Sequence, residues 1–111
     1  MKISKEELLR INDGFGGGLI SSSSLEFAIE QQDNKKFGIY TKLAYLWRAI
    51  LVDHPFSDAN KRTAVFIALA FSTNNKKQAD KELLVHHATS IAKGNITNIR
   101  QIAWRLKNAI R

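Results

Sequence analysis

Apolar residues recur at three- and four-residue steps in six segments of this chain, and polar or glycine-rich stretches separate these segments. They cover residues 5–12, 25–32, 40–52, 63–71 and 80–93, and a last segment begins at Thr97 or Asn98. Such spacing places the apolar side chains on one face of an α-helix. Because the chain has 111 residues and no convincing strand pattern, we expect one domain, residues 1–111, that folds as an all-α bundle of about six helices.

The segment 63–71 differs from the others because it has almost no polar side. A helix that is apolar all round is stable when other helices surround it, so we expect it at the centre of the bundle. Several helix ends are also marked in the sequence. Ser4 and Glu7 have the spacing of a capping box, Ser24 is a possible N-cap, and Gly94-Asn95 is a typical C-terminal stop.

A glycine- and serine-rich stretch lies between the first two predicted helices. It contains Gly14, Gly16, Gly17 and Gly18, and residues 21–24 are all serine; Leu19 and Ile20 lie between the two runs. Glycine adopts backbone angles that are closed to other residues. The stretch therefore predicts a loop or loose hairpin, with a disordered connector as the alternative.

The composition indicates in which cellular compartment the protein works. The chain has no cysteine, so neither disulfides nor thiolate metal ligands are available, which suits a reducing compartment. No apolar stretch approaches the roughly 20 residues of a membrane span, and the first residues lack the apolar core of a signal peptide. We therefore expect a cytoplasmic protein with no membrane partner.

The net charge of +7 is unevenly distributed. Residues 1–75 carry nine Lys and Arg against eight Asp and Glu, whereas residues 76–111 carry eight against two. A basic patch of this kind attracts nucleic acid, an acidic protein surface or an acidic inhibitory segment. The alternative is that these charges only keep the surface helices solvated.

The stretch from His54 to Arg62 places a base, a carboxylate, an amide and two cations within nine residues. His54 can accept a proton from an attacking hydroxyl group, and Asp58 can bind Mg²⁺. Asn60, Lys61 and Arg62 can neutralise phosphate oxygens. Since a buried helix follows directly, we expect these polar residues on a loop that enters it, where an anion is favoured.

These nine residues resemble the signature of the Fic/Doc family, H-x-F-x-(D/E)-x-N-(G/K)-R, at every defined position. The Fic branch typically ends in G-N-G-R, whereas the smaller death-on-curing (Doc) branch reads D-A-N-K-R, as residues 58–62 do here. Ala59 and Lys61 therefore indicate the Doc branch. The glycine-rich loop and the segment Leu25 to Ile29 are similar to the family's flap and the helix behind it, so the resemblance implies a bundle around residues 63–71 with a glycine-rich flap.

The resemblance implies a role for each matching residue. His54 is the general base, Asp58 holds the Mg²⁺ that bridges the phosphates of ATP, and Phe56 anchors the loop in the core. Asn60 and nearby backbone amides form an anion hole, and Arg62 clamps a terminal phosphate.

Lys61 stands where Fic enzymes have Gly, and its side chain crowds the space of the α-phosphate. Doc-like proteins bind ATP in a reversed orientation and transfer its γ-phosphate to a hydroxyl side chain of a protein. In that family the target is translation elongation factor Tu, and the outcome is growth arrest. The resemblance thus implies a Doc-like toxin with protein kinase activity that uses ATP and Mg²⁺.

The resemblance also implies two protein contacts. The flap, with Gly16, Gly17, Gly18, Leu19 and Ile20, would pair its backbone with an extended segment of the target. The inhibitory S/T-x-x-x-E-(G/N) helix of many Fic proteins is matched only in part, because Phe27 stands at its last position. We therefore expect inhibition by a separate antitoxin whose acidic, disordered segment folds onto the basic C-terminal third.

Four other interpretations remain open. A Fic-type enzyme would transfer AMP instead of phosphate. A polar loop with a structural His54 and a capping Asp58 would have no catalytic role. A nucleic-acid-binding module is suggested by the basic last segment, although its core stripe leaves few side chains to read bases, so direct binding of nucleic acid is not expected. A metal-dependent hydrolase would use Asp53, His54, His86 and His87, but the adjacent histidines point to different helix faces and the spacing is not that of metal ligands.

Overall fold

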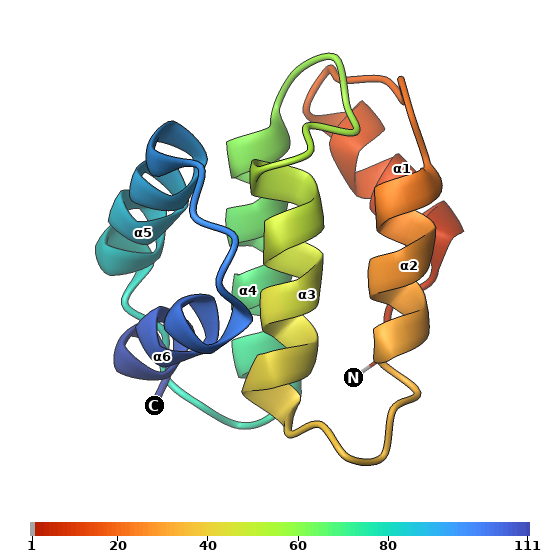
Figure 1. Ribbon diagram of the computed structural model, residues 1–111. Helices are drawn as coiled ribbons and strands as arrows, with labels where there is room; N and C mark the ends of the chain where they lie inside the picture. Colours follow the sequence, from red (N-terminus) through yellow and green to blue (C-terminus); the bar gives the residue numbers. More distant parts are fainter. Residues whose placement is uncertain (1) are drawn as a thin grey trace.

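The computed structural model describes residues 2–111, which form the helical bundle that the apolar pattern predicts (Figure 1). The helices are α1 (Lys5–Gly14), α2 (Ser23–Gln31), α3 (Ile39–Leu51), α4 (Asn60–Asn74), α5 (Lys81–Gly94) and α6 (Ile99–Ala109). Among the described residues there is no strand, only the isolated bridges Leu19–Phe56 and Ala79–Ile110. The prediction of an all-α fold is confirmed, and the stretch predicted as a loop or loose hairpin is a loop.

Helices α3 and α4 lie at the centre of the bundle. Helix α3 packs against α2, α4, α5 and α6, while α4 packs against α1, α3 and α5. The fully buried Trp47 of α3 joins the two helices, because its indole N–H donates to the carbonyl of Ala64 at 2.9 Å. This contact satisfies the only polar group of the indole in the core. It also fixes the spacing of the two helices that the motif loop connects.

The burial of α4 is less uniform than its sequence predicts. Thr63, Ala64, Ile67 and Ala68 are completely buried, yet the Phe66 side chain is 44% exposed. One face of α4 is therefore open to solvent beside α5.

Most of the predicted helix ends are confirmed. The Ser4–Glu7 capping box is formed, and Asn95 ends α5 in the left-handed conformation. Asn98, one of the two predicted starts, is the N-cap of α6. The prediction for Ser24 is wrong, because Ser22 takes the N-cap position of α2 and its hydroxyl donates to the Glu26 carboxylate instead of capping the helix.

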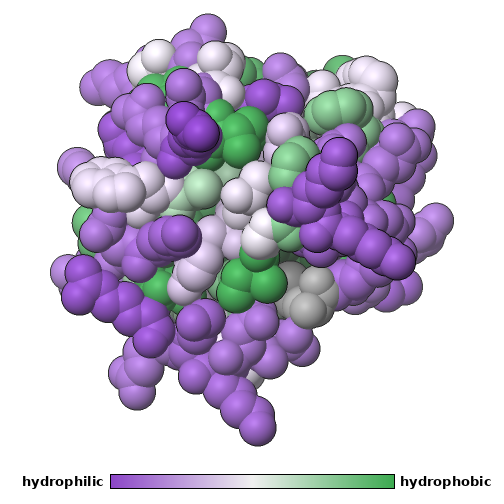
Figure 2. Space-filling view, turned by 60° about the horizontal axis from the view of Figure 1, so that its bottom comes forward, coloured by the Kyte–Doolittle hydropathy of each residue, from purple (hydrophilic) through white to green (hydrophobic). Residues whose placement is uncertain are grey.

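Three parts of the chain meet at one end of the bundle. The loop between α1 and α2 (orange) and the loop between α3 and α4 (green) both lie at the top of Figure 1, next to the C-terminal end of α5. The opposite end, turned toward the viewer in Figure 2, carries mostly hydrophilic residues around small apolar areas. No helix within residues 2–111 has the length and hydropathy to cross a membrane.

Candidate functional site

The loop from residue 52 to residue 59 has an unusual backbone at both ends. His54 and Ala59 have positive φ angles of 48° and 62°, which side chains other than glycine disfavour. Between them Phe56 is 2% exposed, so the predicted anchoring of the loop in the core is confirmed. The buried ring holds the loop in place, while the turns at His54 and Ala59 leave His54, Ser57 and Asp58 exposed.

The turn at Ala59 changes where α4 begins. The sequence placed Asn60, Lys61 and Arg62 on a loop before the helix, but these residues form the first turn of α4. The sharp left-handed turn at Ala59 allows the helix to start three residues earlier than the apolar pattern indicates. The expectation of a loop position was wrong for these three residues and correct for His54 and Asp58.

Helix α4 begins without a side-chain cap. Ala59 has no side-chain acceptor, and the main-chain N–H groups of Asn60, Lys61 and Arg62 find no acceptor among the described residues. Uncapped N–H groups at a helix start attract anions through their own hydrogen bonds and through the helix dipole. Three main-chain donors are therefore available where Lys61 and Arg62 add two positive charges.

The Asn60 side chain already has partners. Its Oδ1 accepts from the Phe56 N–H at 3.3 Å, and its Nδ2 donates to the Phe56 carbonyl at 3.0 Å. This reciprocal pair closes the loop over the buried ring. Asn60 thus has a structural function in the loop, and only one N–H of its amide remains for a ligand.

A cavity of about 780 Å³ brings the predicted site residues together. The residues of the motif that line this cavity are His54, Ser57, Asp58, Ala59, Asn60, Lys61 and Arg62. Helix α5 contributes Thr89 and Lys93, which sequence reasoning missed, because packing of α5 on α4 and not local spacing brings them there. Within residues 2–111 the ion pairs involve only Lys2 and Lys5, so the cations of this cleft have no carboxylate partner.

Asp58 has one occupied and one open carboxylate oxygen. Its Oδ1 accepts from the Ala59 N–H at 2.7 Å, and the other oxygen accepts no hydrogen bond from residues 2–111. In the described part of the chain, no cluster of three His, Cys, Asp or Glu side chains could hold a metal ion. The donor set therefore fits an ion that keeps several waters and takes one protein carboxylate together with phosphate oxygens, which is the preference of Mg²⁺.

The glycine-rich loop is joined to the motif loop. Ser57 N–H donates to the Gly18 carbonyl at 2.8 Å, and the Ile20 N–H donates to the Pro55 carbonyl at 2.8 Å. These bonds use the groups on either side of Leu19, so the N–H and carbonyl of Leu19 itself have no backbone partner within residues 2–111. The side chains of Leu19 and Ile20 are 43% and 69% exposed.

Asn12 is a third residue that sequence reasoning missed. It is 1% exposed, and its Nδ2 donates to the Asp58 carbonyl at 2.9 Å and to the Thr63 hydroxyl at 3.1 Å. The polar stretch Asn12–Asp13–Gly14 resembles a simple helix stop in the sequence. In the fold, the Asn12 side chain connects the end of α1 to Asp58, just before α4, and to Thr63 in the first turns of α4.

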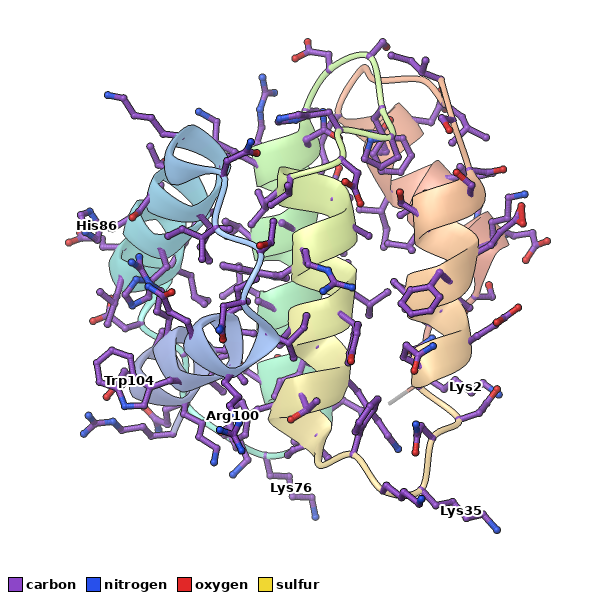
Figure 3. All side chains as sticks on the ribbon, viewed as in Figure 1. Lys2, Lys35, Lys76, His86, Arg100 and Trp104 are labelled. Atoms are coloured by element: carbon purple, nitrogen blue, oxygen red, sulfur yellow. The ribbon has the colours of Figure 1, made fainter. Side chains whose placement is uncertain are left out.

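Three rival sites are not assembled. His86 points away from α5 into solvent, while the ring nitrogens of its neighbour His87 are buried, and neither residue lines the cleft (Figure 3). Glu26, in the incomplete inhibitory motif, is paired with Lys5 outside the cleft; the hydrogen bond from Lys5, followed by that from Ser22, lowers its pKa. Ile102 and Leu106 of α6 are fully buried, as expected for a core stripe and not for a helix that reads bases.

These features define a class: a helical bundle in which a polar loop and an uncapped central helix build one cation-rich cleft. A model of the Fic/DOC family matches residues 3–72, which include the flap, the motif and most of α4. The chain therefore belongs to the Fic/DOC family, whose members are typically transferases that act on proteins and generally use ATP with Mg²⁺. No curated protein and no solved structure matched the chain.

Proposed function

We propose that this chain is a Doc-like toxin that transfers the γ-phosphate of ATP to a hydroxyl side chain of a protein. The observation that carries the proposal is the single cleft in which His54, Asp58, Lys61 and Arg62 meet three unpaired main-chain N–H groups. In the reaction the hydroxyl oxygen forms a bond to Pγ, the bond from Pγ to the bridging β-oxygen breaks, and ADP leaves.

His54 would accept the proton of the attacking hydroxyl group. It lies at the start of the motif loop, is exposed, and makes no hydrogen bond within the described residues, so its ring is free to meet a substrate. Its backbone strain is tolerated because Phe56 fixes the loop two residues later. A general base positioned in this way contributes typically about 10²–10⁴-fold to the rate.

The phosphates would bind at the start of α4. Lys61, Arg62 and the uncapped N–H groups supply donors and positive charge, and Lys93 faces them from α5. Asp58 would hold Mg²⁺ through its open oxygen; the ion neutralises phosphate charge and orients the phosphates. Asn60 contributes mainly by keeping the loop closed, with one N–H left for the anion hole.

The flap would bind the target. Leu19 has one edge paired to the motif loop and leaves its own N–H and carbonyl for an extended segment on the other side. Backbone pairing gives affinity with little dependence on sequence. The exposed Leu19 and Ile20 side chains would contact the residues next to the acceptor hydroxyl. By family resemblance the target is translation elongation factor Tu.

We further propose a cognate antitoxin with an acidic, disordered segment. Residues 76–111 carry eight basic and two acidic side chains, and none of them forms an ion pair with any described residue. On α6, Trp104 is 65% exposed and lies one turn from Arg100 (Figure 3). An exposed aromatic anchor within unpaired cations suits an acidic, partly apolar partner.

The alternative function is AMP transfer by a Fic-type enzyme. Both reactions need His54, Asp58 and Arg62, so these residues do not separate them. Lys61 favours phosphate transfer because its side chain lines the cleft where a glycine would leave space. The mass added to a protein target tests the assignment: phosphate supports it, and AMP contradicts it.

A further inference from the structure

A second cavity, of about 270 Å³, lies between α2 and α3 and shares no lining residue with the cleft. Two buried alanines, Ala28 of α2 and Ala49 of α3, belong to its lining, and their small side chains leave a recess between the helices. Sites for small molecules typically have about 300–1,000 Å³. The size of this recess therefore suits a single side chain of a protein partner better than a whole ligand.

The recess has a polar end beside the flap and the motif loop. Helix α2 begins just after the flap, and α3 ends just before the motif loop (Figure 1). Ser23 and Ser24 lie in the first turn of α2, and Asp53 directly precedes His54; all three line the recess. The N–H of Ser21 donates to the Pro55 carbonyl at 3.2 Å, so the flap crosses the motif loop two residues before α2.

The other end of the recess is aromatic. Phe27 and Tyr45 lie one or two turns further from the flap along their helices. Phe27 meets Tyr45 edge-on with ring centroids 6.0 Å apart, and Phe37 stacks on Tyr45 at 5.2 Å. These contacts hold the Tyr45 ring in place, so this wall of the recess is already formed.

Apolar side chains are exposed from the flap to the recess. Within residues 2–111 seven large apolar side chains are exposed, and three of them are Leu19, Ile20 and Phe27. Phe27 is 49% exposed although it lies on a helix with a buried face, and it is the residue that interrupts the inhibitory motif. Exposed apolar residues that gather in one region mark a surface that binds another protein.

We propose that this recess binds one large apolar or aromatic side chain of the target protein, close in sequence to the acceptor hydroxyl. The inference rests on the proposed function, because it takes the flap as the site of the target segment. An extended segment paired with Leu19 has side chains on alternating faces about every 3.3 Å. A segment that follows the flap toward α2 brings one of them to the polar end of the recess, and a long side chain there reaches Phe27.

The charges of the recess do not select a charged side chain. Its charged lining residues are Arg48 and Asp53, one of each sign. The Arg48 guanidinium lies 5.1 Å from the centroid of the Tyr45 ring and donates to the Thr97 carbonyl at 3.5 Å, so it already has partners. Asp53 is exposed at the polar end, where water solvates it. The aromatic end therefore favours an apolar or aromatic side chain over a charged one.

Transfer to elongation factor Tu by the intact chain tests the proposal through two variants of the recess. Phe27→Ala removes its aromatic wall, and Ser24→Trp fills its polar end. Each should raise the KM for the target by about 3- to 30-fold, the range for losing much of one buried apolar contact. The kcat at saturating target and the increase in melting temperature with Mg²⁺ and ATP should stay as in the wild type, because the cleft is unchanged.

Two matched controls lie outside the recess and the cleft. Ile39→Ala truncates a side chain that is 42% exposed at the start of α3, and Thr73→Trp adds an indole to an exposed position in the last turn of α4. Both controls should keep the KM of the wild type. Because Phe27 and Ser24 lie at the surface, their variants should also keep the melting temperature within a few degrees.

The occupant of the recess is identified by a double-mutant cycle. In full-length elongation factor Tu, each large apolar residue close in sequence to the modified residue is replaced by alanine. One of these replacements should raise the KM of the wild type by a similar factor and add little in Phe27→Ala, because both changes remove the same contact.

The outcomes separate the two proposals. If the wild type adds neither phosphate nor AMP to the target, the proposed function is wrong, and the target subsite is wrong with it. If the target is modified but both recess variants keep the KM of the wild type, the transfer activity holds and the subsite is wrong. The same conclusion follows if the effects of Phe27→Ala and of every target replacement simply multiply, or if the variants lose kcat and ATP binding instead of affinity for the target.

Discussion

The buried Asn12 amide donates a hydrogen bond to the main-chain carbonyl of Asp58 at 2.9 Å, across 46 residues of sequence. The same amide reaches Thr63, so the end of α1 holds the motif loop and the first turn of α4 together. The Asn12 carbonyl also accepts from the Gly17 N–H, which fixes the start of the flap to this point. The position of Asp58 therefore depends on the Asn12 side chain, while the Asn12 main chain holds the start of the flap.

Gly17→Ala should destabilise the protein. A Cβ atom at Gly17 would lie 2.5 Å from the main-chain carbonyl oxygen of Asp58 and closer still to the side-chain oxygen of Asn12. The backbone around Gly17 or Asp58 must therefore shift to make room for it. We expect the free energy of unfolding in urea to fall by about 1–3 kcal/mol, as for other overpacked sites. Gly14→Ala is the control, because nothing lies within 4 Å of its Cβ position. Equal stability of the two variants would contradict the packing around Asn12.

Stability should decrease in mild acid because of His87. Burial, followed by the nearby charges of Arg105 and His86, lowers the pKa of His87 below its ordinary value of 6.5. Both ring nitrogens are buried and have no hydrogen-bond partner in the described part of the chain. The unfolded chain therefore binds a proton more readily, and stability is lost as the pH falls below about 6.5 toward the lower folded pKa. His87→Leu should reduce this loss in urea titrations at pH 7.5 and 5.5, whereas the exposed His86→Ala should retain most of it.

The sequence predicted the parts of this fold that depend on local periodicity. Apolar spacing identified all six helices, and the capping box at Ser4 and the stop at Asn95 follow from side-chain chemistry within one turn. The start of α4 was missed because it depends on a left-handed Ala59, a residue without a turn preference that the sequence could reveal.

The residues of the candidate site were also predicted only where they are close together in the sequence. The motif places its own residues in one cleft because they are close in sequence and share a turn. Asn12, Thr89 and Lys93 were not predicted, since only the packing of α1 and α5 against α4 brings them there. The hydrogen bonds between the Asn60 side chain and the Phe56 backbone were also not predicted. A side-chain amide can bond equally well to a ligand or to the backbone of a loop, and the sequence does not distinguish the two.

His54→Ala should abolish transfer without abolishing nucleotide binding. His54 is exposed and its side chain forms no hydrogen bond with the described residues, so the variant should fold and bind ATP. We expect the rate of phosphate transfer to fall by roughly 10²–10⁴-fold, with loss of growth arrest in cells. His86→Ala is the matched control, because His86 is an exposed histidine on α5 outside the cleft. Full transfer by the His54 variant would exclude this residue as the base.

Asp58→Asn and Arg62→Ala should each reduce the increase in melting temperature that Mg²⁺ and ATP produce. Asp58 provides the open carboxylate oxygen, and Arg62 lies in the uncapped first turn of α4. Ligand stabilisation depends on affinity, so a smaller shift at equal ligand concentration reports weaker binding. Asp53→Asn, an exposed carboxylate one residue before His54 and outside the cleft, should behave as the wild type. Unchanged shifts in both site variants would mean that the motif is structural.

Lys61→Gly should remove the kinase reaction and open space for weak AMP transfer. The Lys61 side chain lines the cleft, so its loss removes a phosphate partner and the obstacle to an α-phosphate near His54. Incubation of the variant with ATP and elongation factor Tu, followed by comparison of initial transfer rates with the wild type, measures the change. A variant with wild-type kinase activity would show that Lys61 does not select the phosphate.

The most direct measurement of the central claim is the mass that the unmodified protein adds to a target. The chain is incubated with Mg²⁺, ATP and elongation factor Tu, and the product is weighed by mass spectrometry, with His54→Ala as the control. The proposed function predicts an addition of about 80 Da, one phosphate, that the control lacks. An addition of about 329 Da, one AMP, would contradict the Doc-like kinase while leaving the Fic/DOC fold in place.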